Sequence, residues 1–241
     1  MPTLLRRLCL TAGLFVLALP VFAAPPAQPW QPLFSLLARS APSLDRQVLQ
    51  KAVAAMQCAV RHGATPARRL AVIDYSRPSS ERRLWIFDLE RPRLLLKEFV
   101  AHGQNSGEDQ ATRFSNRDGS HQSSLGLFRT VETYEGQHGY SLRMDGLEPG
   151  INDRARERDI VIHGADYVDP LWIARQGRIG RSHGCPAVRP EVARMVVDSL
   201  KDGQFMFSWY PDRQWLRHSA YLNCNSNQLA SALALPGGTL R

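Results

Sequence analysis

Short β-prone runs, separated by polar turns, restrict the fold of this chain more than any other feature of its sequence. They span residues 70–75, 84–89, 94–100, 125–131, 140–144, 160–162 and 204–210. Runs of aliphatic and aromatic residues bounded by Pro, Ser and Gly are typical of strands. Because they do not alternate regularly with helical segments, a doubly wound parallel sheet is disfavoured. The sequence predicts a mainly β fold with a few helices, of the α+β class.

Other segments have different patterns. Apolar residues recur at helical spacing over 44–61, where Ser43 is the expected N-cap, and a second helix is expected over 190–201. Residues 24–42 are rich in Pro and Ala and are expected to form a linker. The polar residues 102–124 are expected to form a long loop of the kind that often carries function.

Residues 1–23 have the composition of an export signal. Arg6 and Arg7 precede an apolar stretch over 8–19, and small residues permit cleavage after Ala23. The apolar stretch is shorter than the roughly 20 residues that span a membrane. We therefore expect the protein to be exported to the periplasm or cell envelope, with no transmembrane anchor after processing.

Charge and composition exclude several classes of function. Cleavage would remove two arginines and no acid, lowering the formal net charge from +8 to +6. No nucleic-acid recognition motif accompanies this charge, so nucleic acid is not an expected partner. The 44% hydrophobic and 22% charged residues are ordinary for a globular protein, which excludes disorder of the whole chain.

The residues best suited to chemistry lie between 160 and 188. A buried strand ends at His163 and Gly164, and a glycine- and arginine-rich loop, residues 177–184, leads to Cys185. A thiolate is the nucleophile of cysteine enzymes, and a nearby imidazole generates it. Glycine beside the nucleophile lets a substrate carbonyl approach backbone N–H groups that can hold a developing oxyanion.

Each of these residues also has a plainer interpretation. His163 and His183 suit packing or hydrogen-bonding roles, and Cys185 suits an inert buried thiol, the commonest state of free cysteine. A metal site made from the three is disfavoured, because their spacing does not match the usual zinc patterns. The residues alone leave catalysis and structure open, and neither a metal nor another cofactor is expected.

The block Ser182-His183-Gly184-Cys185, preceded by His163-Gly164, resembles the signature of the L,D-transpeptidase (YkuD-like) catalytic domain. The resemblance runs from about residue 68 to 212 and includes residues 83–88, 101–103, 114–116, 123–126, 141–147 and 162–167. The Ser-x-Gly-Cys-Pro-Ala-Val block is similar to that of the exported murein L,D-transpeptidase branch. The resemblance implies a β-sandwich or open barrel with the cysteine at the end of a groove.

The resemblance also implies roles for individual residues. Cys185 is the expected nucleophile and His163 the expected general base, oriented by the backbone of Gly164. Ser182, His183 and Gly184 are expected to shape the site, with backbone N–H groups near the cysteine as the oxyanion hole. His183 is a second candidate base, because Trp often stands there in this branch. We favour His163, because a base should face the thiol from another segment.

Candidate substrate-binding residues are Arg178, Arg181 and Tyr167. The guanidinium groups of the two arginines can bind a carboxylate or lower the pKa of a nearby thiol. Tyr167 could pack on the stem peptide, although most aromatic residues in such stretches belong to the core or its rim. The broader family often has Arg or Asn where this chain has Ala187. Arg181 or Arg189 is the expected replacement for that contact.

The substrate implied by the resemblance is the peptide stem of peptidoglycan (murein). Cys185 would form a thioester with a tetrapeptide stem, and the acyl group would pass to an amine of another stem or of a wall-attached protein. Two alternatives stay open. The first is an endo- or carboxypeptidase-type hydrolase on the same scaffold. The second is a non-catalytic murein-binding module.

With Cys185 as the free thiol and Cys9 removed with the signal, Cys58 and Cys224 remain. We expect them to form a disulfide that ties the first helix to the C-terminal segment. The predicted organisation is a signal peptide (1–23), a linker plus N-terminal helix (24–66), a catalytic domain (67–215) and a C-terminal tail (216–241).

Overall fold

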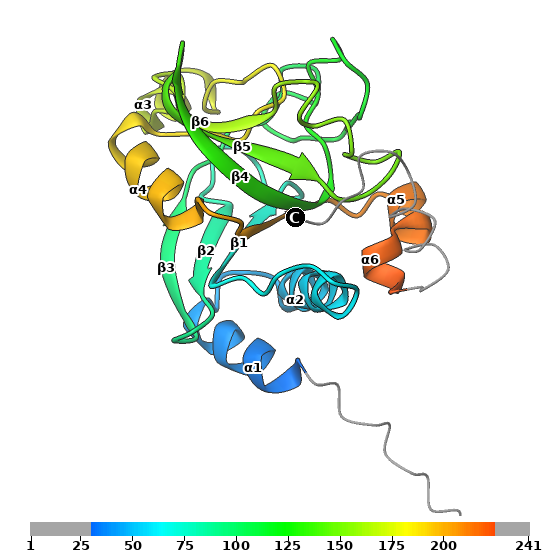
Figure 1. The fold of residues 1–241 in the computed structure, drawn as a ribbon. Helices are drawn as coiled ribbons and strands as arrows, with labels where there is room; N and C mark the ends of the chain where they lie inside the picture. The colour runs from blue at the N-terminus through cyan, green and yellow to red at the C-terminus, as the bar shows by residue number, and fades with distance from the viewer. Residues whose placement is uncertain (1–29, 225–241) are drawn as a thin grey trace, which may run out of the picture.

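The computed structural model describes residues 30–224, and its centre is one eight-stranded mixed sheet (Figure 1). The predicted signal peptide therefore lies outside the described residues. The strands are β1 (Arg69–Asp74), β2 (Leu84–Asp88), β3 (Arg93–Glu98), β4 (Gly126–Gly136), β5 (Gly139–Gly146), β6 (Val161–Gly164), β7 (Ala187–Val188) and β8 (Phe205–Trp209). Each predicted run forms a strand, and the β-rich fold with a few helices is confirmed. Only the two-residue β7 was not predicted.

The strand order is β3-β2-β1-β8-β4-β5-β6-β7. The pairs β1–β8 and β6–β7 are parallel, and the other neighbouring pairs are antiparallel. Strands β2 and β8 are buried along their whole length, because helices cover both faces of the central sheet. Burial on both faces explains why these strands are continuous apolar runs rather than alternating ones.

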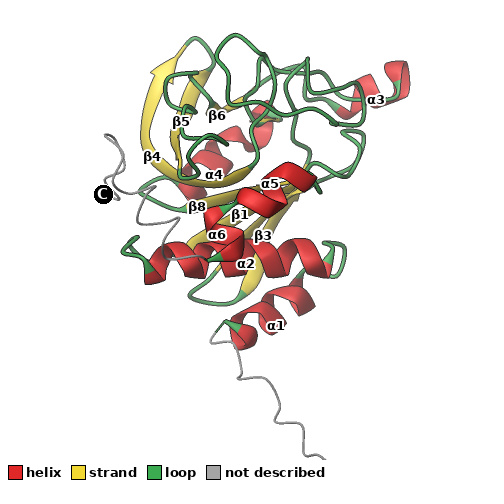
Figure 2. Ribbon diagram, turned by 90° about the vertical axis from the view of Figure 1, so that its right-hand side faces the viewer, coloured by secondary structure: helices red, strands yellow, loops and turns green. Residues whose placement is uncertain are grey.

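The helices are α1 (Gln31–Ser40), α2 (Arg46–Arg61), α3 (Pro170–Gln176), α4 (Pro190–Leu200), α5 (Arg213–His218) and α6 (Ala220–Asn223). In Figure 1, α2 and α4 lie on different sides of the curved sheet, and Figure 2 shows α5 and α6 beside α2. Helices α2 and α4 were predicted from their apolar spacing. Within the described residues, no helix is both long enough and apolar enough to span a bilayer.

Two details of the N-terminal segment differ from the sequence-based expectation. Residues 31–40 form α1 rather than a linker, and Phe34 and Leu37 bury its apolar side against α2 and β3. Helix α2 is capped by Asp45 rather than Ser43. The Asp45 carboxylate accepts backbone N–H bonds from Gln47 and Val48 at 2.7 and 3.2 Å. A short helix that depends on tertiary packing has little local signal.

The C-terminal segment packs on the same side of the sheet as α2. Cys58 on α2 and Cys224 after α6 form a disulfide, with 5.7 Å between their Cα atoms. Trp215 on α5 and Tyr221 on α6 are buried. Helices α5 and α6 therefore pack on the core, although the sequence placed most of them in a tail. The domain boundaries themselves stay predictions.

Candidate active site

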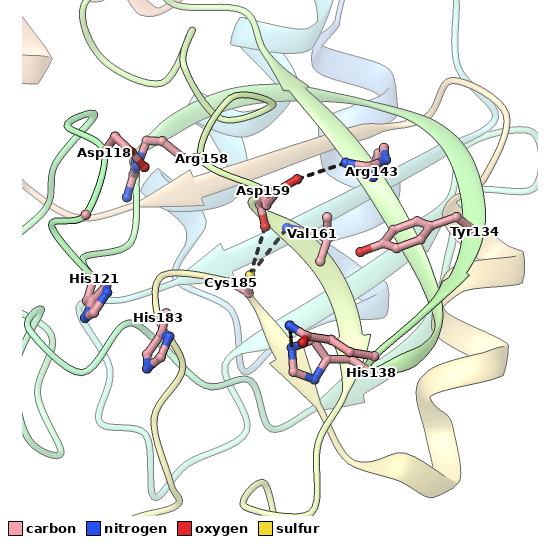
Figure 3. Close-up of a pocket in the computed structure, with 12 residues that line it drawn as sticks. Asp118, His121, Tyr134, His138, Arg143, Arg158, Asp159, Val161, His183 and Cys185 are labelled. Atoms are coloured by element: carbon pink, nitrogen blue, oxygen red, sulfur yellow. Dashed lines mark hydrogen bonds and ion pairs between the residues drawn. The ribbon is translucent and has the colours of Figure 1, made fainter.

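Cys185 lies in a surface hollow of about 460 Å³ (Figure 3). Four regions line it: residues 118–121 of the long loop, the β4–β5 hairpin, the segment that leads into β6, and the turn that carries His183 and Cys185. The lining residues are Asp118, Gly119, His121, Tyr134, Gln137, His138, Arg143, Arg158, Asp159, Val161, His183 and Cys185.

A tight turn before Cys185 sets the position of the thiol. Gly184 has φ +128°, and a Cβ there would lie 2.9 Å from both the Gln122 carbonyl oxygen and Ile160. Only glycine suits this backbone. The Ser182 hydroxyl accepts the Gly184 N–H at 3.0 Å and donates to the Cys185 carbonyl at 2.7 Å. Ser182 therefore fixes the turn, and the Gly184 N–H is not available to an oxyanion in this arrangement.

The long loop supports the turn from beneath. Ser182 N–H donates to the His102 carbonyl at 2.9 Å, and its own carbonyl accepts the Gln104 N–H at 2.7 Å. The Ser123 hydroxyl accepts the Gly103 N–H at 3.0 Å and donates to the Gly184 carbonyl at 3.2 Å. Residues 102–124 therefore form much of the floor of the site, as expected of a functional loop.

Arg83, at the start of β2, anchors this floor. Its guanidinium is fully buried, and it donates to His102 Nδ1 at 2.6 Å and to the Val100 carbonyl at 3.0 Å. Burial, and then the charge of Arg83, lower the pKa of His102 to about 3. His102 is therefore neutral, and its Nδ1 accepts the hydrogen bond from Arg83.

The thiol of Cys185 is partly buried and held by backbone atoms. Its sulfur accepts the Val161 N–H at 3.5 Å, and the S–H donates to the Asp159 carbonyl at 3.4 Å (Figure 3). Burial raises the pKa of this thiol, although the Val161 N–H and the Arg158 guanidinium act in the opposite direction. The resting sulfur is thus a protonated thiol that needs a base to react.

His163 lies on β6, two residues after Val161, whose N–H contacts the thiol. It pairs with Ala187 across the β6–β7 ladder, and it shares a face of β6 with Val161. Its Nδ1–H donates to the Gly164 carbonyl at 2.8 Å, which leaves the Nε2 lone pair free to take a proton. Burial lowers the pKa of His163, so the imidazole is neutral at neutral pH.

The second candidate base, His183, has a different position. It is exposed at the rim of the hollow, and its ring stacks on His121 with centroids 4.3 Å apart and an angle of 9°. It comes from the turn that carries Cys185 rather than from an opposing strand. This placement favours His163 as the base.

A sequence model described as the L,D-transpeptidase catalytic domain matches residues 40–209. The chain belongs to this family. The region matched includes the Cys185 turn and β6 and begins before the β-rich part, so it covers α2 as well.

Solved L,D-transpeptidase structures are similar to the chain at low identity. That of Mycobacterium smegmatis is 16% identical over 61% of this chain and 60% of that chain, with a TM-score of 0.37. L,D-transpeptidase 1 of Mycobacterium tuberculosis is 12% identical over 59% of this chain and 62% of that chain, with a TM-score of 0.34. That of Stackebrandtia nassauensis is 11% identical, covering 73% and 76%, with a TM-score of 0.36. The match spans less than two thirds of the first two proteins. No curated protein matches the chain.

The arginines predicted from the L,D-transpeptidase resemblance do not line the Cys185 hollow. Arg178 and Arg181 both bind Glu108, at 3.0 and 2.7 Å, and Arg181 also donates to the Gly107 carbonyl. Arg189 pairs with Glu98. Their guanidinium groups are used to hold loops, because each lies next to an acidic partner.

Tyr167, the third predicted substrate residue, lines a second hollow of about 530 Å³. Its backbone carbonyl accepts the Gly180 N–H at 2.7 Å, which ties the segment after β6 to the loop before Cys185. This second hollow adjoins the first, since Gln137 and His138 line both.

Two other arginines line the Cys185 hollow. Arg143 on β5 binds Asp159 at 3.1 Å and lies over the ring of Tyr134. Arg158 donates to the Ser115 and Gln122 carbonyls at 2.6 and 2.7 Å. Both arginines reach the hollow through tertiary folding, far in sequence from the cysteine, so no local pattern marks them.

Within residues 30–224, one group of side chains comes close enough to share a metal ion: Cys58, His62 and Cys224, with potential ligand atoms within 4.8 Å. The disulfide occupies both sulfur atoms, and thiolates are the species that ligate metals. This group is therefore a structural crosslink rather than a metal centre, and it lies far from the Cys185 hollow.

Proposed function

We propose that this chain is a cysteine acyltransferase that acts on the peptide stems of peptidoglycan. The observation that carries the proposal is the position of Cys185, the free thiol among the cysteines of residues 30–224, in a hollow next to the strand of buried His163. A thiol with a neutral imidazole on a neighbouring strand suits nucleophilic catalysis. The substrate class follows from membership of the family.

The proposed reaction has two steps. His163 Nε2 takes the thiol proton as the Cys185 sulfur attacks the carbonyl of the third, diamino-acid residue of a tetrapeptide stem. The C–N bond to the terminal D-alanine breaks, and D-alanine leaves with that proton, so a thioester remains. An amine on another stem, or on a wall-attached protein, then attacks the thioester and frees the thiol.

The second hollow favours transfer to an amine over hydrolysis. Gly164, the residue after the proposed base, lines it, and His138 stands between the two hollows. The carboxylate of Asp166 is exposed there and would attract an ammonium group. An acceptor bound in this hollow would reach the thioester from the side of His163.

Mass spectrometry of defined muropeptides tests the proposal. Mature protein incubated with a tetrapeptide donor and a separate amine acceptor should yield cross-linked dimer and a transient adduct on Cys185, and Cys185→Ala should yield neither. Tripeptide without dimer, at a large excess of acceptor, would establish the hydrolase instead. Absence of both adduct and product would establish the murein-binding module.

Export to the periplasm or cell envelope belongs to the same proposal. The charged and apolar pattern of residues 1–23 supports it, and so does the Cys58–Cys224 disulfide, since disulfides persist in oxidising compartments. Protein recovered from the envelope fraction should begin at Ala24 by N-terminal sequencing. Recovery of the uncleaved chain in the cytosol would contradict it.

A further inference from the structure

The tip of the β4–β5 hairpin reaches the proposed base. Gly136 pairs with Gly139 in the ladder, so Gln137 and His138 alone form the turn. Gly139, directly after these two residues, has φ +70°, the left-handed conformation that commonly follows the turn in short hairpin loops and that glycine adopts readily. Because long strands flank so short a turn, His138 is held at a defined place between the two hollows.

The ring of His138 lies on the ring of His163. Their centroids are 4.3 Å apart and their planes differ by 22°. His138 is exposed, whereas His163 is only 2% exposed. The exposed imidazole therefore covers the face of the buried one, and a smaller side chain at the tip would open that face to water.

Besides packing in the buried interior, one hydrogen bond orients the ring of His163. The hydrogen bond from Nδ1 to the Gly164 carbonyl holds one ring atom, at 2.8 Å. Strand β6 has four residues and pairs with the two-residue β7, so the local framework is short. A general base must keep its lone pair within hydrogen-bond reach of the proton that it takes. A second contact on the ring face is needed to hold that direction.

We propose that His138 is a positioning residue for His163. Stacked on the imidazole, it holds the Nε2 lone pair toward the Cys185 thiol and keeps water from the ring. The inference rests on the function proposed above, in which His163 is the general base. Nothing in the family signature marks the residue, because it lies outside the blocks that surround the cysteine.

The stack also has a consequence for pH dependence. Burial lowers the pKa of His163, the Gly164 carbonyl opposes this, and the charge that His138 can carry lowers it further. Other titratable or charged groups on the surrounding elements line the two hollows. They are Tyr134 on β4, Tyr140 and Arg143 on β5, Arg158 and Asp159 before β6, Asp166 and Tyr167 after β6, His183 and Cys185 on the turn, and Arg194 on α4.

Truncating His138 removes both the cover and the nearby charge, and each change raises the pKa of His163. Since the base must be unprotonated, activity falls as pH drops through that pKa. The acid limb of the pH–rate profile should therefore move to higher pH.

Steady-state kinetics on muropeptides across pH test the proposal with three variants. His138→Ala should lower kcat about tenfold, a part of the roughly 10²–10⁴-fold that a general base supplies, with the acid limb at higher pH. His138→Phe keeps a stacked ring without its charge, so its kcat and acid limb should lie between those of His138→Ala and the wild type. His218→Ala, which removes an exposed imidazole from α5, should match the wild type.

A role in substrate binding alone would raise KM and leave kcat and the acid limb unchanged, and that result would overturn the proposal. A direct measurement tests the positioning role of His138 separately from the proposed function. In ¹⁵N NMR of the histidine side chains without substrate, His163 should titrate at higher pH in His138→Ala than in the wild type. An unchanged titration would overturn the stacking role. An inactive wild type whose His163 titration still shifts would overturn only the proposed function.

Discussion

The two sulfur sites of this protein belong to different parts of the fold and are held in different ways. Cys185 is a partly buried thiol that lines a hollow, and it is held by two backbone contacts of 3.4 and 3.5 Å. Cys58, on α2, is fully buried and is bonded to Cys224, which follows α6. The comparison teaches that residue type does not decide the role of a cysteine here. The surroundings do, through access, hydrogen bonds and a partner within reach.

The first site should control activity without affecting stability, and the second should do the opposite. The glycine turn and the Ser182 hydrogen bonds place the Cys185 thiol, so the thiol itself carries little of the structure. The disulfide closes a loop of 166 residues that includes the whole sheet. The following predictions test this separation, from the largest expected effect to the smallest.

Replacing the thiol should have the largest effect. Cys185→Ala should abolish the covalent adduct and all transfer, because no other group of the turn can form a thioester, while the thermal unfolding temperature stays unchanged. Adduct mass and thermal unfolding followed by circular dichroism measure the two properties. Residual turnover in this variant, or a large loss of stability, would contradict the prediction that Cys185 controls activity alone.

Removing the disulfide should cost stability and preserve chemistry. The double variant Cys58→Ala/Cys224→Ala should lose up to about 5 kcal/mol of unfolding free energy, the loop-closure estimate for so long a loop. Its kcat at 25 °C should equal that of the wild type, since neither Cys58, Cys224 nor any residue of α2 or α6 lines the hollow. Urea unfolding measures the first and the muropeptide assay the second. A loss of activity in the folded double variant would show that the sites are coupled.

The charge near the thiol can be tested by alkylation. Because burial raises the pKa of Cys185, the rate of reaction with iodoacetamide should rise only above the pH range of an ordinary thiol. Arg158 acts against burial, so Arg158→Gln should move that rise to still higher pH. Arg154→Gln is the matched control, since Arg154 is exposed and pairs with Glu157. Equal profiles for both variants would remove Arg158 from this role.

The smallest effect is expected at Glu148, whose side chain contacts Trp215 of α5. Its buried carboxylate accepts N–H bonds from Leu127 and Trp215 at 2.9 and 3.0 Å. Burial raises its pKa above the unfolded value, against the effect of these hydrogen bonds and one from Ser219. Its contribution to stability is therefore complete below the unfolded pKa and declines as pH rises through the folded one.

Glu148→Gln should lack that decline. The unfolding free energy of the variant minus that of the wild type should be larger at neutral pH than at acid pH. The increase should be on the order of 1 kcal/mol, the scale of one buried hydrogen bond. Urea unfolding at several pH values gives the difference. Parallel pH dependences for the two proteins would assign Glu148 no titration-linked role.

Sequence reasoning recovered features that have a local cause. The strands are visible because branched and aromatic runs end at turn residues, and α2 and α4 because apolar residues repeat at helical spacing. Features that depend on packing were missed. Helix α1 is stabilised by the burial of Phe34 and Leu37, and the Asp45 cap depends on where the helix begins. The pairing of Arg178 and Arg181 with Glu108 was missed in the same way, because Glu108 approaches from another part of the chain.

By itself, the sequence determined the β-rich class, the family and the candidate pair Cys185 and His163, because short-range pattern and motif encode them. The tertiary structure decided which groups surround that pair. His138 reaches the base through a hairpin, and Arg143 and Arg158 reach the hollow from β5 and from the segment before β6. The physical reason is that the register of paired strands and the path of loops bring distant residues within a few ångströms. No local stretch of sequence specifies those distances.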